Sequence, residues 1–200
     1  TRSRETRRRL IRAAIELWNE RGFEDAFEET PAEEIARAAG VSRGTFYFHF
    51  AHKDDVLLEM SWATGELLAA EAETGIGRDV PAFDLTSQLM TSLARRVARA
   101  PRTAVARATQ HWARLGHGPR ERLDPRSFRA AFRTLVVYAS ARGDLPPEVD
   151  IDELAALLEA ATMDALAGWA LGDDAPAALR RRLCRRADII LHGAAATALG

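Results

Sequence analysis

The chain has 200 residues, enough for one large or two small domains, and 47% of them are hydrophobic, which is enough for a packed core. A formal net charge of −1 and an isoelectric point near 6.5 argue against a protein that coats nucleic acid through its overall charge. Any contact with DNA must therefore come from a local basic surface. The N-terminal arm offers one, opposed there only by Glu5: Arg2, Arg4, Arg7, Arg8, Arg9 and Arg12.

The single cysteine, Cys184, excludes a disulfide framework within the chain and fits a reducing cytoplasm. It falls near the inward stripe of the last expected helix, so we expect a packed, inert thiol rather than a redox sensor. We find no apolar run long enough to span a bilayer, and the N-terminus lacks the apolar stretch of a signal peptide. The expectation is a cytoplasmic protein with no membrane partner.

Helical spacing runs through almost every periodic segment, and no stretch alternates as a β-strand does, so the predicted fold is all-α. The first helix is expected over 6–20, with an apolar stripe opposite its arginines and Gly22 at its end. Residues 23–29 are interpreted as an acidic connector that delays the second helix. This connector carries Glu24, Asp25, Glu28 and Glu29.

Residues 30–53 predict two short helices joined by a tight glycine turn. Thr30 is expected to cap the first helix, Glu33 to complete a capping box, and Gly40 to end the helix. Ser42 is expected to cap the second helix, which is aromatic on one face and polar on the other. Its inward residues are Phe46 and Phe50, and its outward residues are Arg43, Gly44, Thr45, Tyr47 and His49.

The rest of the chain predicts longer helices, separated by Gly- and Pro-containing breaks. Gly75, Gly77 and Pro81 are expected to break the first of them, and the run from Gly116 is expected to be a loop. Asp150 is expected to cap a later helix in a capping box with Glu153. The expected ranges are 53–73, 83–100, 102–115, 127–142, 150–171 and 177–192.

The run GVSRGTFYFHFAHKDDVL, behind a capped IARAAG helix and an amphipathic first helix, resembles the DNA-binding domain of the TetR family of transcriptional regulators. The remainder is similar to that family's effector domain in layout only. The resemblance implies an N-terminal three-helix helix-turn-helix domain, residues 1–53, and a C-terminal helical ligand-binding and dimerisation bundle, residues 54–200. It also implies a homodimeric repressor, without enzymatic activity or cofactor, that binds double-stranded operator DNA and is released by an unidentified small-molecule effector.

Individual positions can be carried over from the family's motif. Ser42, Arg43, Gly44 and Thr45 match its base-reading and groove-entering positions. Tyr47, His49 and Lys53 match its phosphate-contacting positions, and Thr30 matches the threonine whose hydroxyl and N–H meet a phosphate. The long acidic connector departs from the pattern, as does His52, which stands where the family often has a capping serine.

An effector pocket in a helical domain would be lined by apolar and aromatic side chains with a few polar ones. Plain core packing explains any single candidate at least as well. His111 and His117 share no helical face and have no carboxylate or cysteine at ligand spacing, so no metal site is expected. The pocket candidates are Met60, Trp62, Phe83, Met90, His111, Trp112, Phe128, Tyr138 and Met163.

The last two expected helices, 151–171 and 177–192, could form a four-helix bundle with the same pair from a second chain. The alternative is that both helices pack only within the monomer. The apolar seam predicted for a homodimer consists of Leu158, Ala165, Trp169, Leu183 and Ile190.

Two other classes of function were weighed. Residues 40–44 match the G-x-S-x-G nucleophile elbow of hydrolases, but that motif needs a preceding strand and here follows a helix. An enzyme would also need paired acids, a metal cluster or a cofactor motif on a common face, and we find none. The remaining alternative is a helical partner-binding protein whose helix-turn-helix no longer binds DNA, for which the acidic connector gives some support.

Overall fold

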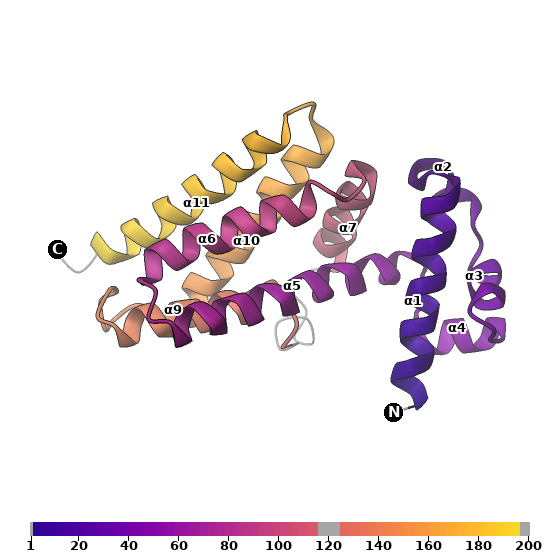
Figure 1. Cartoon of the computed structure of the whole chain (residues 1–200), viewed down its shortest axis with the longest axis horizontal. Coiled ribbons are helices and arrows are strands. Elements are labelled where there is room, and N and C mark those ends of the chain that lie inside the picture. The colour runs from indigo at the N-terminus through magenta and orange to yellow at the C-terminus, as the bar shows by residue number, and fades with distance from the viewer. Residues whose placement is uncertain (1, 116–124, 197–200) are drawn as a thin grey trace.

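The computed structural model describes residues 2–115 and 125–196, and all regular secondary structure in these ranges is helical (Figure 1). The all-α prediction is confirmed. His117 and most of the predicted loop from Gly116 lie outside the described residues. An N-terminal unit contains α1 (Arg2–Arg21), α2 (Phe23–Glu29), α3 (Ala32–Ala38) and α4 (Arg43–His49). The long helix α5 (Asp54–Gly77) leads from it to α6 (Ala82–Val97), α7 (Arg102–Leu115), α9 (Phe128–Ala141), α10 (Ile151–Leu171) and α11 (Pro176–Ala196).

Two hydrophobic cores lie at the two ends of α5. In the N-terminal core, Trp18 and Phe46 are buried between the short helices, and Val56 and Leu57 from the first turns of α5 complete it. Ala104 of α7 also belongs to this core. The division predicted at Lys53 therefore falls just before residues that pack with the N-terminal unit, because α5 is shared between the two cores.

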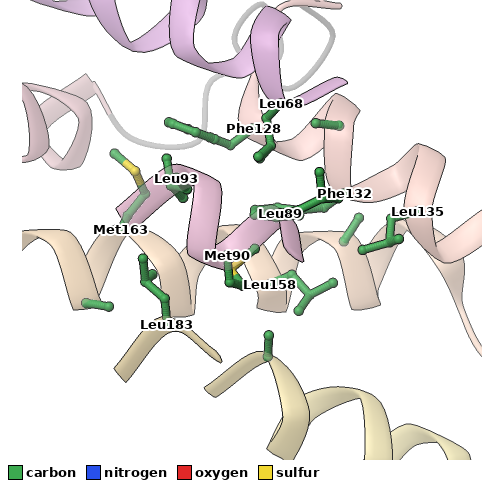
Figure 2. Packing of buried hydrophobic residues seen from close by; sticks show 14 of the residues in the cluster. Leu68, Leu89, Met90, Leu93, Phe128, Phe132, Leu135, Leu158, Met163 and Leu183 are labelled. Atoms are coloured by element: carbon green, nitrogen blue, oxygen red, sulfur yellow. The ribbon is translucent and has the colours of Figure 1, made fainter. Parts of the chain in front are cut away.

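The C-terminal core joins α5, α6, α9, α10 and α11 (Figure 2). Figure 2 shows Leu89, Met90 and Leu93 of α6 between the surrounding helices. Within the described residues, α10 is long and apolar enough to cross a membrane by length and composition, contrary to our expectation, yet half of it is buried inside the protein. Such burial is typical of a core helix, whose apolar side chains pack against neighbouring helices.

Glycines allow α5 to lie very close to its neighbours. A Cβ on Gly75 would collide with the Leu85 side chain of α6, and one on Gly65 would collide with the carbonyl oxygen of Arg126. We predicted that Gly75 would break the helix, but α5 continues to Gly77. A glycine costs a helix only about 1 kcal/mol, and the packing that it permits against α6 offsets that cost.

The segment interpreted as an acidic connector is in fact the helix α2. Phe23, Ala26 and Phe27 recur at helical spacing and are buried, and the Phe27 ring centroid lies 4.9 Å from that of Trp18. Its acidic residues hid this apolar stripe in the sequence. Thr30 is consequently the C-cap of α2, and its N–H donates to the carbonyl oxygen of Ala26 at 2.9 Å.

The capping box predicted at Thr30 and Glu33 is wrong. The N-cap of α3 is Pro31, and no side chain bonds to the helix there. The predicted caps at Ser42 and Asp150 are confirmed, because the Ser42 side chain accepts from the Thr45 N–H and the Asp150 side chain from two N–H groups. Thr30 could not cap α3 because it still belongs to the last turn of α2.

Candidate nucleic-acid interface and ligand cavity

Helix α4 presents a polar face to solvent from a rigid base. Ser42 Oγ accepts from the Thr45 N–H at 3.1 Å and lies 2.9 Å from Thr45 Oγ1, which fixes the start of the helix. Phe46 and Phe50 are almost completely buried, whereas the side chain of Arg43 is 65% exposed. The predicted inward residues are therefore confirmed. Of the predicted outward residues, Thr45 and His49 are only partly exposed, and the others are exposed.

Arg43 and Tyr47 form an exposed pair one turn apart. The Arg43 guanidinium lies 5.7 Å from the centroid of the Tyr47 ring, and Tyr47 is 48% exposed. Glu33 approaches Arg43 at 3.9 Å, but both side chains are well exposed, so this ion pair contributes little free energy. Loose contacts of this kind leave the guanidinium available to a base edge or a phosphate.

Gly44 leaves open space on the same face. A Cβ at this position would meet only Ser42 Oγ, at 3.8 Å, so nothing in the described structure requires a glycine here. A glycine inside a helix costs about 0.5–1 kcal/mol relative to alanine. The space that it leaves is suited to close approach by another molecule.

Phe48 belongs to this face and was missed in the sequence. Its side chain is 80% exposed, the highest exposure of the large hydrophobic residues in the described structure. Helical spacing from Phe46 and Phe50 places it outward, which was the available signal. An apolar ring at a nucleic-acid interface can contact the methyl group of thymine.

The arginines at the start of α1 divide into two sets. Arg7 donates to the carbonyl oxygen of His49 at 2.8 Å and to Glu59 Oε1 at 2.5 Å, so it joins α4 to α5. Arg9 donates to the carbonyl oxygen of Ala39 at the end of α3. These two arginines hold the unit together, although Arg9 is itself exposed. Three further exposed arginines form a stripe at helical spacing: Arg4, Arg8 and Arg12.

His49 is half-buried beside this cluster. Burial lowers the pKa of its imidazole, and the nearby Arg7 guanidinium lowers it further. The neutral imidazole is therefore favoured at neutral pH and retains one N–H donor. Contact between His49 and a phosphate stays a prediction.

Two predicted phosphate contacts have unexpected surroundings. Thr30 is completely buried, so its hydroxyl cannot reach a phosphate in this conformation, and that prediction is corrected. Lys53 Nζ donates to the carbonyl oxygens of Phe27 and Glu28, the latter at 2.9 Å, and burial lowers its pKa. Lys53 thus anchors the C-terminal end of α2, where the helix dipole favours a cation.

Helix α2 also contacts α7. The Arg107 guanidinium of α7 pairs with Glu28 and lies 4.6 Å from the centroid of the Phe27 ring. One acid of the segment therefore faces α7. Figure 1 shows α2 and α4 towards opposite ends of α1.

A cavity of about 110 Å³ lies between α5, α6, α7, α9 and α10. Three of the predicted pocket residues line it: Met60, Phe128 and Met163. Sequence reasoning missed the small and polar residues of the wall because it favoured aromatic side chains. Among the missed residues are Ser61, Thr64, Arg96, Ala104, Val105 and Thr109.

The other predicted pocket residues lie elsewhere. His111 is buried, with Nε2 3.0 Å from Asp55 Oδ1, and Tyr138 donates to the carbonyl oxygen of Val80 at 2.9 Å. Met90 is buried in the C-terminal core, and Trp112 packs against it. The two remaining rings are covered by neighbours: Trp62 by Arg126 and Phe83 by His192.

The predicted dimer seam also needs correction. Leu158, Ala165, Trp169 and Leu183 are at most 2% exposed within the single chain, so they pack internally and are not available to a partner. Ile190 is only partly buried. The large apolar side chains that α10 and α11 expose include Leu157 and Ile189, at 49% and 61%. The sequence could not separate these faces because α10 is apolar around most of its circumference.

Residues 10–60 match the family model described as "Bacterial regulatory proteins, tetR family". Over these residues the chain carries a tetR-family domain. This tetR domain extends from Leu10 in α1 to Met60 in α5 and includes the whole exposed face of α4. Met60, the last residue of the matched segment, also lines the cavity.

Curated relatives match over about a third of this chain. The transcriptional regulator AcrR of Shigella flexneri is 37% identical over 71 residues, covering 36% of this chain and 31% of AcrR. TcmR of Streptomyces glaucescens is 41% identical over 70 residues, covering 35% and 29%. The chain thus spans about a third of the length of these relatives.

The whole fold matches solved structures. FadR of Thermus thermophilus, a TetR-family transcriptional repressor solved with lauroyl-CoA, superposes with a TM-score of 0.78. The superposition covers 94% of each chain at 24% sequence identity. The helical domain beyond the tetR domain therefore has the arrangement found in a structure of this family.

Proposed function

We propose that this protein is a DNA-binding transcriptional regulator, a homodimeric repressor that a small molecule releases from its operator. The observation that carries the proposal is the outer face of α4, where Arg43 and Tyr47 are exposed beside the open space at Gly44. A helix held by buried phenylalanines and exposing such residues suits insertion into a major groove. The named relatives are transcriptional regulators, which favours this class over an enzyme.

Dimerisation would follow from the exposed apolar residues of α10 and α11. Leu157 and Ile189 expose large side chains on two adjoining helices, and the same pair on a second chain would form a four-helix bundle. The two α4 helices would then read half-sites one DNA turn apart, roughly 34–36 Å, or slightly more. The expected operator is therefore a palindrome.

Release would act through α5 and α7, which both form walls of the cavity. Helix α5 follows α4 and holds Arg7 through Glu59, while α7 holds α2 through Arg107. A ligand that moved either helix would change the position of α4 relative to the α4 helix of the second chain. A coupling of about 1–3 kcal/mol between ligand and operator is typical of such regulators. FadR, with the same fold, was solved with a small-molecule thioester.

The alternative is a partner-binding protein whose helix-turn-helix does not bind DNA. Its main support was the acidic segment before α3. That segment is a folded helix, and Glu28 pairs with Arg107 of α7. The structure thus gives this acid a role between the two cores, and the support for the alternative weakens.

A mobility-shift assay with the DNA upstream of the protein's own gene tests the proposal. We expect a discrete complex, competed by a palindromic duplex but not by an unrelated duplex of equal length. Binding that does not discriminate between the two duplexes, or no binding at low salt, would contradict a role as an operator-binding regulator.

Changing Lys53 to alanine separates its two possible roles. We expect the free energy of unfolding to fall by about 1 kcal/mol, because α2 loses charge-assisted bonds at its C-terminal end. If Lys53 also contacts a phosphate, the slope of log K against log salt should become shallower by about 0.9. Lys53→Arg is the control and should retain both properties. An unchanged slope in Lys53→Ala would restrict the residue to anchoring α2.

A further inference from the structure

The ligand cavity combines an apolar wall with a single charged side chain. Among its described lining residues, only Arg96 is charged, and the others are apolar or carry hydroxyl groups. The hydroxyls of Thr64 and Thr109 donate to carbonyl oxygens of their own helices. The strongest hydrogen-bond donor available in the wall is therefore the Arg96 guanidinium.

Arg96 is only partly satisfied within the protein. One of its terminal nitrogens, Nη2, pairs with Glu71, but no acceptor in the described residues bonds to its Nε, although that atom is buried. A buried donor without an acceptor costs about 1–3 kcal/mol. A ligand acceptor would reach Nε after a shift of the side chain that exposes this atom to the cavity, and the new hydrogen bond would remove this cost.

The local charge favours an anion. Arg95 and Arg96 both act on Glu71, so two guanidinium groups stand against one carboxylate. Burial raises the pKa of Glu71, but hydrogen bonds from Ser92 and Arg96 outweigh that effect and hold the pKa below its usual value. Glu71 therefore stays ionised at neutral pH, and the cluster retains one excess positive charge.

The geometry points to a small amphipathic carboxylate as the effector, with its apolar body between Met60, Phe128 and Met163 and its carboxylate on Arg96. This inference rests on the proposed function, because it names the chemical class of the ligand for the same cavity. A carboxylate oxygen forms a charge-assisted hydrogen bond with a guanidinium, about twice as strong as a neutral one. An amine of the same shape would be repelled.

The size of the cavity limits the ligand. Its 110 Å³ is somewhat smaller than the engineered cavity of about 150 Å³ that holds benzene. Methionine side chains adapt readily to new neighbours, and Met60 and Met163 both line the wall. We therefore expect carboxylates with short apolar chains to fit, with longer chains or a ring requiring the two methionines to move.

The methionines also provide the test, because the chain has only three. Met60 and Met163 line the cavity, whereas Met90 lies in the C-terminal core outside the lining. Hexanoate should shift the methyl NMR signals of Met60 and Met163 in protein labelled at methionine methyl carbons, and should affect Met90 less. Hexan-1-ol should bind more weakly, and hexylamine should not bind.

Matched variants test the role of the guanidinium. In Arg96→Gln the Kd for hexanoate should rise by at least about tenfold, as expected for loss of a charged hydrogen bond. Arg133→Gln is the control, because Arg133 is exposed on α9, pairs with Asp152 and lies outside the cavity lining. Arg96→Lys keeps the charge and should give an intermediate Kd. An unchanged Met90 signal shows that each variant is folded.

Equal binding of hexanoate and hexan-1-ol, or equal losses in Arg96→Gln and Arg133→Gln, would overturn the assignment. Operator binding measured by fluorescence anisotropy on the same samples separates this failure from failure of the proposed function. A protein that binds operator but not hexanoate overturns only the ligand class. One that binds hexanoate at Arg96 but no operator supports the ligand class and overturns the regulatory function.

Discussion

Changing Arg43 to alanine is expected to lower operator affinity between about fivefold and 150-fold, because a bidentate arginine–guanine pair contributes about 1–3 kcal/mol of discrimination. Arg43 is largely exposed on the first turn of α4, and within the described residues a weak ion pair and the Tyr47 ring are its side-chain contacts. Its loss should therefore leave the unfolding temperature nearly unchanged. Fluorescence anisotropy with operator and scrambled duplexes measures both affinity and discrimination.

Substitutions of Tyr47 test the same face of α4 through a second measurement of operator affinity. Tyr47→Phe keeps the ring that packs on Phe46 and removes only the hydroxyl, so a loss of affinity reports a contact by that hydroxyl. The control for charge is Arg133→Ala. Arg133 is exposed on α9, outside the helix-turn-helix, and pairs with Asp152. Unchanged operator binding in both Arg43→Ala and Tyr47→Ala would show that α4 does not read DNA.

Changing Leu157 and Ile189 together to glutamate is expected to convert the protein to a monomer. These side chains are about half or more exposed on α10 and α11, and two chains would bring four new carboxylates into one apolar interface. Like charges brought together at an interface cost several kcal/mol. Sedimentation equilibrium should show the loss of the dimer, with retained helicity by circular dichroism.

Operator affinity should fall with the dimer. A monomer binds one half-site and loses the gain from linking two sites, which is about 10²–10⁴. Val137→Glu is the control, because Val137 is also an exposed apolar residue but lies on α9. A dimer that survived the double substitution would show that the chains associate through another surface.

The helix-turn-helix could be predicted closely because its signals are local. Ser42 caps the helix that begins one residue later, and Phe46 and Phe50 recur at the spacing of buried residues. Cap chemistry and helical periodicity depend on residues within one or two turns. The predicted N-cap of α3 was wrong because Thr30 already serves as the C-cap of the preceding helix, α2.

The cavity and the proposed dimer face could not be predicted in the same way. Met60, Arg96 and Met163 come together from three helices, and no local spacing relates them. Leu158 and its neighbour Leu157 are equally apolar in the sequence, yet one is buried and the other is 49% exposed. Which side of an apolar helix is buried depends on where its neighbours lie.

The sequence by itself thus determined the all-α class and the exposed polar face of α4, since both arise from side chains a few residues apart. Only the tertiary structure decided that the acidic segment is a helix held by Lys53 and Arg107, and that Arg96 lines a cavity. Those contacts join residues that are far apart in the chain. Their energies depend on burial and on the geometry of packed helices, which local periodicity does not specify.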